Sequence, residues 1–149
     1  MRGLGRRSPV FLCALLMSIA PCLAGDDDWT VVTLARDGSW GVACDRSQPR
    51  AIAEAIRYCR AMSGGASDCG AQLTAARGGW TVANLCGDHK VIATGDSLAE
   101  AETEALNREI SLQLFYVPDL PRCKRVVTVD SGRSTVTSSL QVSAARQGR

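Results

Sequence analysis

The strongest constraint on the fold is a stretch of sequence that the chain contains twice. Residues 29–37 read WTVVTLARD, and residues 80–88 read WTVANLCGD. With their tryptophans aligned, the two copies run together for sixteen further residues without a gap, and they match again after a one-residue deletion. The sequence therefore predicts a tandem duplication, with one repeat over residues 29–76 and the other over residues 80–130.

Each copy begins with the pattern of a β-hairpin. In the first copy, residues 29–35 and 40–44 are short apolar runs rich in Val and Trp, which is typical of strands. The Asp-Gly dipeptide at residues 37–38 favours a tight turn between them, because glycine adopts positive φ at low cost. Residues 88–89 of the second copy read DH at the equivalent place, where the same hairpin is expected.

A helix and a third strand follow the hairpin in both copies. Ser47 and Ser97 are expected to begin the helices, and Glu100 lies three residues after Ser97, which is the pattern of a capping box. Apolar residues then recur at helical spacing and predict one buried stripe per helix. The stripes are Ile52, Ala55, Ile56, Cys59 and Met62 in the first copy and Ala101, Ala105, Leu106, Ile110 and Leu114 in the second. The third strands are expected to start at Cys69 and Cys123.

The predicted unit is thus strand, strand, helix, strand, and the chain contains it twice. A helix cannot bury its apolar stripe alone, so both helices should pack on one or both faces of a largely antiparallel sheet. The fold class is predicted to be α+β, a disulfide-stapled sandwich with internal pseudo-symmetry.

The N-terminal segment has the layout of a secretory signal peptide. Arg2, Arg6 and Arg7 precede an apolar run over residues 10–20. That run is shorter than the roughly 20 residues that a helix needs to cross a bilayer, so no permanent membrane span is expected. Residues 1–24 are predicted to be removed on export, and the mature protein is predicted to be periplasmic or secreted.

The remainder is predicted to form one α+β domain over residues 25–130, followed by a disordered, Ser-rich polar tail over residues 131–149. The predicted leader holds three of the seventeen basic residues and none of the fifteen acidic ones, so the mature chain is nearly neutral. A nearly neutral chain lacks the broad positive field that nucleic-acid binding requires. The expected partner is an unknown protein or another envelope component.

Five of the seven cysteines lie in the predicted mature chain. In an exported protein such cysteines are interpreted first as disulfides. Cys59 and Cys69 lie at the two ends of a short loop and are predicted to form a bond that stabilises the fold by about 2–3 kcal/mol. The other pairings stay open: Cys44 pairs with Cys86, or Cys86 pairs with Cys123, and Cys123 is otherwise free.

Six segments spread over residues 29–127 carry a family resemblance. They read WTVVTLA, SWGVACDRS, RAIAEAIRYC, DCGAQL, NLCGD and SLAEAETEAL. Through them the chain resembles the bacterial family catalogued as domain of unknown function 4189. The resemblance implies an exported, cysteine-containing small domain with no agreed activity. The family usually has a cysteine where this chain has Glu109 and another after the last strand, so the resemblance implies that Cys123 has lost its usual partner.

One histidine lies near a cysteine in the second copy. His89 follows Cys86 by three residues, and this pair could act as a thiolate nucleophile with its base or as half of a metal site. Two ligands fall short of a tetrahedral zinc site, which would need Cys44 or Cys123 as well. The alternative is a turn residue after a disulfide-bonded strand, and no catalytic residue, cofactor or metal ligand is predicted.

Three tryptophans offer a second route to binding. Trp29 and Trp80 begin the two repeats, and Trp40 lies on the next strand. An exposed cluster of them would bind glycan, peptidoglycan or peptide. Their equivalent placement favours a shared core instead, where large aromatic side chains contribute most.

The acidic residues of the second helix are expected to form a solvated face. Glu100, Glu102 and Glu104 point in different directions on a helix, and Arg108 follows Glu104 at a spacing that favours an ion pair. The sequence contains no Gly-rich phosphate loop, no Ser-His-Asp set and no complete metal motif.

These observations predict a non-enzymatic binding or structural accessory module of the bacterial envelope. Two alternatives stay open. The first is a thiol-dependent activity, redox or Cys-His, at Cys86 and His89. The second is glycan or peptidoglycan binding through an exposed tryptophan.

Overall fold

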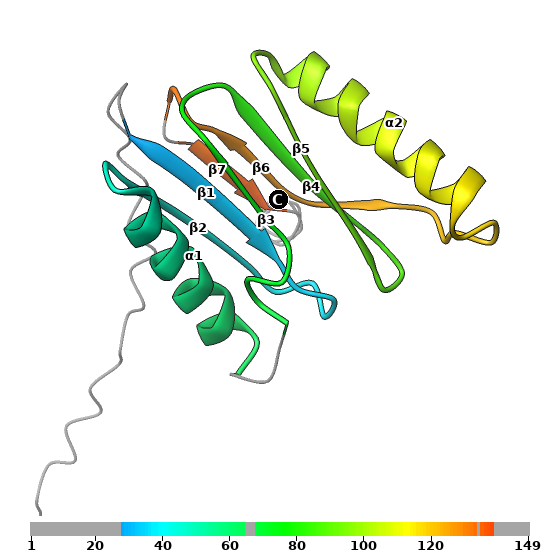
Figure 1. Cartoon of the computed structure of the whole chain (residues 1–149), viewed down its shortest axis with the longest axis horizontal. Helices are drawn as coiled ribbons and strands as arrows, with labels where there is room; N and C mark the ends of the chain where they lie inside the picture. Colours follow the sequence, from blue (N-terminus) through cyan, green and yellow to red (C-terminus); the bar gives the residue numbers. More distant parts are fainter. Residues whose placement is uncertain (1–27, 65–67, 134, 139–149) are drawn as a thin grey trace, which may run out of the picture.

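A computed structural model describes residues 28–64, 68–133 and 135–138 (Figure 1). The predicted signal peptide and most of the predicted tail lie outside these residues. Within them, no helix is long and apolar enough to cross a membrane.

Seven strands form two antiparallel sheets. Sheet A contains β1 (Trp29–Leu34), β2 (Trp40–Asp45) and β3 (Leu73–Ala76) in the order β2-β1-β3. Sheet B contains β4 (Trp80–Cys86), β5 (His89–Gly95), β6 (Lys124–Asp130) and β7 (Thr135–Ser138) in the order β5-β4-β6-β7. Helix α1 (Gln48–Met62) follows β2, and helix α2 (Leu98–Phe115) follows β5. The predicted α+β class is confirmed, but the strands divide into two sheets.

The order strand, strand, helix, strand occurs in each half of the chain, with small corrections to the predicted boundaries. The third strands begin at Leu73 and Lys124, later than expected. The second hairpin turns at residues 87–88, where Gly87 has a φ of 61°, and His89 is the first residue of β5. Strand β7 pairs with β6, so the ordered part of the chain extends past the predicted boundary at residue 130.

The two sheets pack face to face and each helix covers one outer face (Figure 1). Val32 and Leu34 of β1 share a core cluster with Ala83 of β4 and Val127 of β6. Because side chains alternate along a strand, the next residues of each strand point the other way, toward a helix. Val31 and Ala43 pack with Ala51 and Ala55 of α1, and Val82 packs with Ala101 and Ala105 of α2. The layers are therefore helix, sheet, sheet, helix.

The helix starts follow the sequence closely. Ser97 and Glu100 form the predicted capping box, in which each side chain accepts a hydrogen bond from the other residue's backbone N–H. Ser47 makes no such side-chain bond, although its backbone N–H donates to Asp45 Oδ1 at 2.6 Å. Helix α1 comes so close to β2 that a Cβ at Gly41 would lie 1.9 Å from the backbone oxygen of Ala55.

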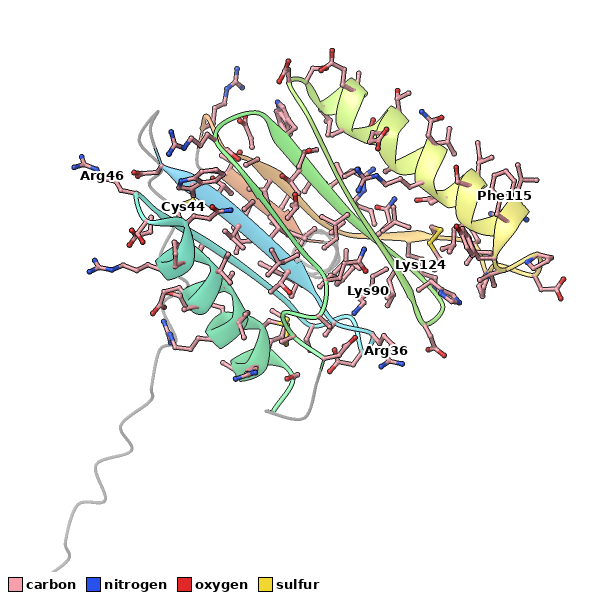
Figure 2. The ribbon with its side chains drawn as sticks, in the orientation of Figure 1. Arg36, Cys44, Arg46, Lys90, Phe115 and Lys124 are labelled. Atoms are coloured by element: carbon pink, nitrogen blue, oxygen red, sulfur yellow. A yellow bond between two sulfur atoms is a disulfide. The ribbon has the colours of Figure 1, made fainter. Side chains whose placement is uncertain are left out.

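A carboxylate joins the two halves at one end of the sheets. Asp68 accepts hydrogen bonds from the backbone N–H of Arg36 at 2.8 Å and from the Lys90 ammonium of β5. Figure 2 shows Arg36 and Lys90 close together at this end of the strands. The Lys90 hydrogen bond, followed by that from Arg36, lowers the pKa of Asp68 well below its usual range.

Candidate functional site

The exposed side of α2 carries a row of apolar side chains, which contradicts the predicted burial of three of its residues. Leu106, Ile110 and Leu114 recur every four residues, so they lie along one side of the helix. They are 55%, 44% and 69% exposed. Phe115, at the end of α2 in Figure 2, and Tyr116, which follows the helix, are 75% and 78% exposed. We call these five residues the α2 ridge.

The ridge exists because α2 packs on sheet B through small side chains. Ala101 and Ala105 are fully or almost fully buried against the sheet. Alanines at these positions allow the helix to lie close to the strands, and Leu98 and Leu112 pack beside them against the same cluster. Leu106, Ile110 and Leu114 point away from the strands. The sequence pattern placed alanines and leucines in one stripe, because helical periodicity groups apolar residues without showing which of them face the core.

Helix α1 provides a comparison within the same molecule. Its outer surface is charged: Glu54 and Arg57 form an ion pair at 2.6 Å, and Arg50 and Arg60 are exposed. Met62 is its one exposed large apolar side chain in the described part of the chain, at 43%. A polar outer face is the usual state of a surface helix, so the apolar ridge is a particular property of α2.

The predicted acidic face of α2 is divided among separate interactions. Glu100 belongs to the capping box. Glu102 lies 3.3 Å from Arg125, and Glu104 forms the predicted ion pair with Arg108 at 2.7 Å. Arg108 also donates to the backbone oxygen of Ile92 at 2.6 Å, on the edge strand of sheet B. These residues border a shallow open groove between α2 and the end of β5, lined by Thr94, Gly95, Asp96, Ala99, Glu100, Thr103, Glu104, Asn107 and Arg108.

Two disulfides staple the described residues. Cys59 and Cys69 are bonded, as the short loop between them predicts, and their sulfurs are 2.02 Å apart. The second disulfide joins Cys86 to Cys123, with the Cα atoms 4.0 Å apart. Cys123 therefore has a partner, contrary to what the family resemblance implied.

The alternative pairing of Cys44 with Cys86 is wrong. Cys44 is in sheet A and Cys86 is in sheet B, where β4 pairs with β6 and not with β2. Figure 2 shows Cys44 far from Lys124, the residue that follows Cys123. Cys44 is itself disulfide-bonded.

Three neighbouring strands place a histidine and the second disulfide in one row. Cys86 of β4 is opposite His89 of β5. On the other side of β4, Leu85 is opposite Lys124 of β6. Cys86 is the residue after Leu85 and Cys123 the residue before Lys124, so the two cysteines are also opposite one another, and they form the disulfide. Residues opposite one another on paired strands point to the same face of the sheet. This row therefore lies on the face of sheet B that α2 covers.

The side chain of Glu109 extends from α2 toward this row of residues on sheet B. One of its carboxylate oxygens and the sulfurs of Cys86 and Cys123 all lie within 4.8 Å of one another. Asn84, which is 8% exposed, donates to Glu109 Oε1 at 2.5 Å and accepts from Arg125 Nε at 2.7 Å. The result is a chain of polar side chains between α2 and sheet B.

The sequence did not predict the contact of Glu109 with Asn84 or that of Asn84 with Arg125. These residues come from three elements that are far apart in sequence, and only the pairing of β4 with β6 and the seating of α2 bring them together. The sequence contains one indication that position 109 differs between the two halves: when the halves are aligned, Glu109 corresponds to Cys59. In the disulfide form, Cys86 has no thiol that His89 could activate, and it is fully buried.

The tryptophans contribute to packing. Trp40 is 7% exposed and lies in the core between the sheets, as predicted. Trp29 and Trp80 are half-buried against the cores under α1 and α2. The guanidinium of Arg77 lies 4.6 Å from the centre of the Trp29 ring. This arrangement does not form an exposed aromatic platform for a glycan among the described residues.

Comparisons of the chain with protein-family models, with curated protein sequences and with solved structures gave no match. Two features of the structure bear on function: the α2 ridge, and the end of sheet B where Cys86 and Cys123 are bonded.

Proposed function

We propose that the protein is a non-enzymatic binding module of the bacterial envelope that works as a pair of identical chains joined through the α2 ridge. The observation that carries this proposal is the exposure of Leu106, Ile110, Leu114 and Phe115 on one helix and of Tyr116 directly after it. Burying one such side chain is worth about 1.5–3 kcal/mol. Large exposed apolar surfaces on an otherwise polar protein mark interaction sites.

The spacing of the ridge favours a second copy as its occupant. Leu106 and Leu114 lie four residues before and after Ile110. If two α2 helices pack antiparallel around a two-fold axis at Ile110, Leu106 of one copy meets Leu114 of the other. A two-fold interface of this kind uses the same surface on both chains and closes after two copies.

The charges beside the ridge support the same arrangement. The first half of α2 carries Glu100, Glu102 and Glu104, which also interact within the chain. The segment after the helix carries the exposed residues Asp119, Arg122 and Lys124 and is therefore net positive. Antiparallel pairing would bring the acidic start of one α2 toward the basic segment of the other. Such complementarity favours one register of association over others.

We also propose that the chain arose by tandem duplication and that it is exported from the cytoplasm. The repeated element order and the equivalent places of Trp29 and Trp80 support a tandem duplication. The six segments that carry the resemblance support membership of the family catalogued as domain of unknown function 4189. Two internal disulfides support export to an oxidising compartment. According to this proposal the two repeats came to differ in the exposed residues of their helices. The exposed Arg60 of α1 corresponds to Ile110 in the ridge of α2.

The test is the mass of the exported protein in solution, measured by sedimentation equilibrium over a range of concentrations. The wild type is expected to form dimers. Ile110→Glu and Leu114→Glu are each expected to weaken association about tenfold or more. Each removes an apolar side chain whose burial is worth about 1.5–3 kcal/mol, and about 1.4 kcal/mol corresponds to a factor of ten.

Arg60→Glu is the matched control, since it places a glutamate at the corresponding point of α1, and it should leave association unchanged. Circular dichroism will show that all three variants keep the fold. A wild type that is monomeric at every concentration would contradict the second-copy occupant and would leave the ridge to a different protein.

A further inference from the structure

We propose that the Cys86–Cys123 disulfide is a redox-controlled metal site, which binds Zn²⁺ through Cys86, Cys123, Glu109 and His89 once the disulfide is reduced. This site is independent of the dimer interface, because its side chains lie on the inner face of α2 and on the covered face of sheet B.

The ligand set is of the kind that zinc prefers. Zinc sites in proteins are tetrahedral, with metal–sulfur distances of about 2.3 Å and metal–oxygen or metal–nitrogen distances of about 2.0–2.2 Å, so neighbouring ligand atoms lie about 3.5–4 Å apart. The carboxylate oxygen already lies within 4.8 Å of both sulfurs, and the two sulfurs, which are bonded here, would have to separate to that spacing after reduction by rotation of their side chains. Among the residues that the structure describes, these three form the one group of this kind.

His89 would complete the set after rotation of its side chain, since its ring nitrogens lie outside the group that the other three residues form. It is directly opposite Cys86 on the neighbouring strand and is half-buried on the same face of sheet B. A turn of two residues, 87–88, joins Cys86 to His89, so the backbone fixes the position of His89 relative to Cys86. Two thiolates, one carboxylate and one imidazole complete a tetrahedral set.

The carboxylate is already oriented for this role. Asn84 donates a hydrogen bond to Glu109 Oε1 at 2.5 Å, and Arg125 fixes Asn84 by donating to its Oδ1 at 2.7 Å. Hydrogen bonds of this type hold metal ligands in zinc sites and tune their affinity. Glu109 has a second carboxylate oxygen, and the bond to Asn84 uses only one.

The two disulfides differ in access. Cys59 and Cys69 are 0% and 7% exposed, whereas Cys123 is only half-buried beside the fully buried Cys86. An external thiolate therefore reaches Cys123 first. The backbone pairing of β4 with β5 and β6 continues from Trp80 to the end of β4, so these strands remain joined when the sulfur–sulfur bond opens.

The chemical step requires a dithiol reductant. One thiolate of the reductant attacks Cys123 Sγ, the bond to Cys86 breaks, and Cys86 leaves as a thiolate. The second thiol of the reductant then attacks the mixed disulfide and releases Cys123. The cysteines gain two electrons and two protons, and the reductant becomes a disulfide. Zn²⁺ then displaces the two thiol protons as it binds.

The experiment measures Zn²⁺ binding by the exported full-length protein, by competition with a chromophoric chelator. Oxidised protein is expected to bind no zinc, and protein reduced with a dithiol and freed of it without oxygen is expected to bind one Zn²⁺ per chain. With Co²⁺ as the probe, the reduced protein should show the charge-transfer absorption of cobalt–thiolate bonds. Glu109→Gln and His89→Gln should each lower zinc affinity about tenfold or more.

Two control variants show whether zinc binds at this site and not at another carboxylate or cysteine pair. Glu104→Gln alters a carboxylate on the same helix that pairs with Arg108, and it should leave zinc affinity unchanged. The double variant Cys59→Ser with Cys69→Ser should still bind one Zn²⁺ after reduction. The proposal is overturned if the reduced wild type unfolds or binds no zinc, or if binding survives in Cys86→Ser.

Discussion

Asp68 shows how a single residue joins the two halves of the chain. It lies in the loop before β3, yet its carboxylate accepts from Arg36 after β1 and from Lys90 of β5. The ion pair with Lys90 is partly shielded, since the two side chains are 21% and 10% exposed. Gln72 adds a second link by donating to the backbone oxygen of Lys90 at 3.1 Å. These contacts close one end of the interface between the sheets.

The lowered pKa of Asp68 predicts how stability changes with pH. Because the pKa of this group is lower in the folded state than its ordinary value of 3.8, the group stabilises the fold fully above that value. The contribution is lost as the pH falls below 3.8 toward the folded-state pKa. Asp68→Asn should therefore be less stable than the wild type at pH 7, and the difference should shrink at about pH 3. Urea unfolding at the two pH values measures this, and a difference that is independent of pH would refute it.

At the scale of the elements, the first turn of α2 differs from that of α1. Ser97 accepts a hydrogen bond from the backbone of Glu100, whereas Ser47 makes no side-chain cap. Ser97→Ala is expected to cost about 1 kcal/mol, which is typical of a lost cap. Ser47→Ala is the matched control and should change the free energy of unfolding by less than about 0.5 kcal/mol. Equal losses in both variants, measured by chemical denaturation, would contradict the assignment of the cap.

The contact between α1 and β2 depends on a glycine. A Cβ at Gly41 would lie 1.9 Å from the Ala55 oxygen and 2.8 Å from the Cys59 nitrogen, so α1 would have to move away from the sheet. Gly41→Ala is expected to destabilise the protein by about 1–3 kcal/mol, the usual range for overpacking. At Gly132 the nearest atom to an added Cβ is 3.6 Å away, so Gly132→Ala should be tolerated. Thermal unfolding of both variants compares the two positions.

Most of the elements were predictable from local sequence, but their partners were not. The Asp-Gly turn, the capping box and the valine-rich runs identify the strands and helices, since each depends on residues close together in the chain. The short loop between Cys59 and Cys69 predicted that disulfide for the same reason. The pairing of Cys86 with Cys123, and the contact of Glu109 with Asn84, depend on β4 lying beside β6, which is a property of strand order. The outward direction of Leu106 depends on how closely α2 packs on the sheet.

Helix α2 combines the two proposed sites on opposite faces. Its outer face carries the ridge, and its inner face presents Glu109 to Cys86 and Cys123. A zinc ion held by Glu109 would add a bond between α2 and sheet B. The dimer and the metal site are separable in experiment, because Ile110→Glu alters only the outer face and Glu109→Gln only the inner one.

At the scale of the whole molecule, the two halves are joined by a common core. The inner face of sheet A, with Val32, Leu34 and Trp40, packs against the inner face of sheet B, with Ala83 and Val127. Neither half buries this face without the other. Each half of the chain is therefore expected to be unstable alone, and the intact chain should unfold in one cooperative step.

Leu34→Ala tests this cooperativity. Leu34 is fully buried between the sheets, so removing its side chain should cost about 2–5 kcal/mol. Because the core is common to both halves, native-state hydrogen exchange should show the same loss of protection for the slowest amides of β1 and β4. Thr137→Ala, at an exposed position of β7, is the control and should change protection by less than about 0.5 kcal/mol. If the β4 amides kept wild-type protection while those of β1 lost it, the halves would be independent folding units, and the layered core would not be what holds them together.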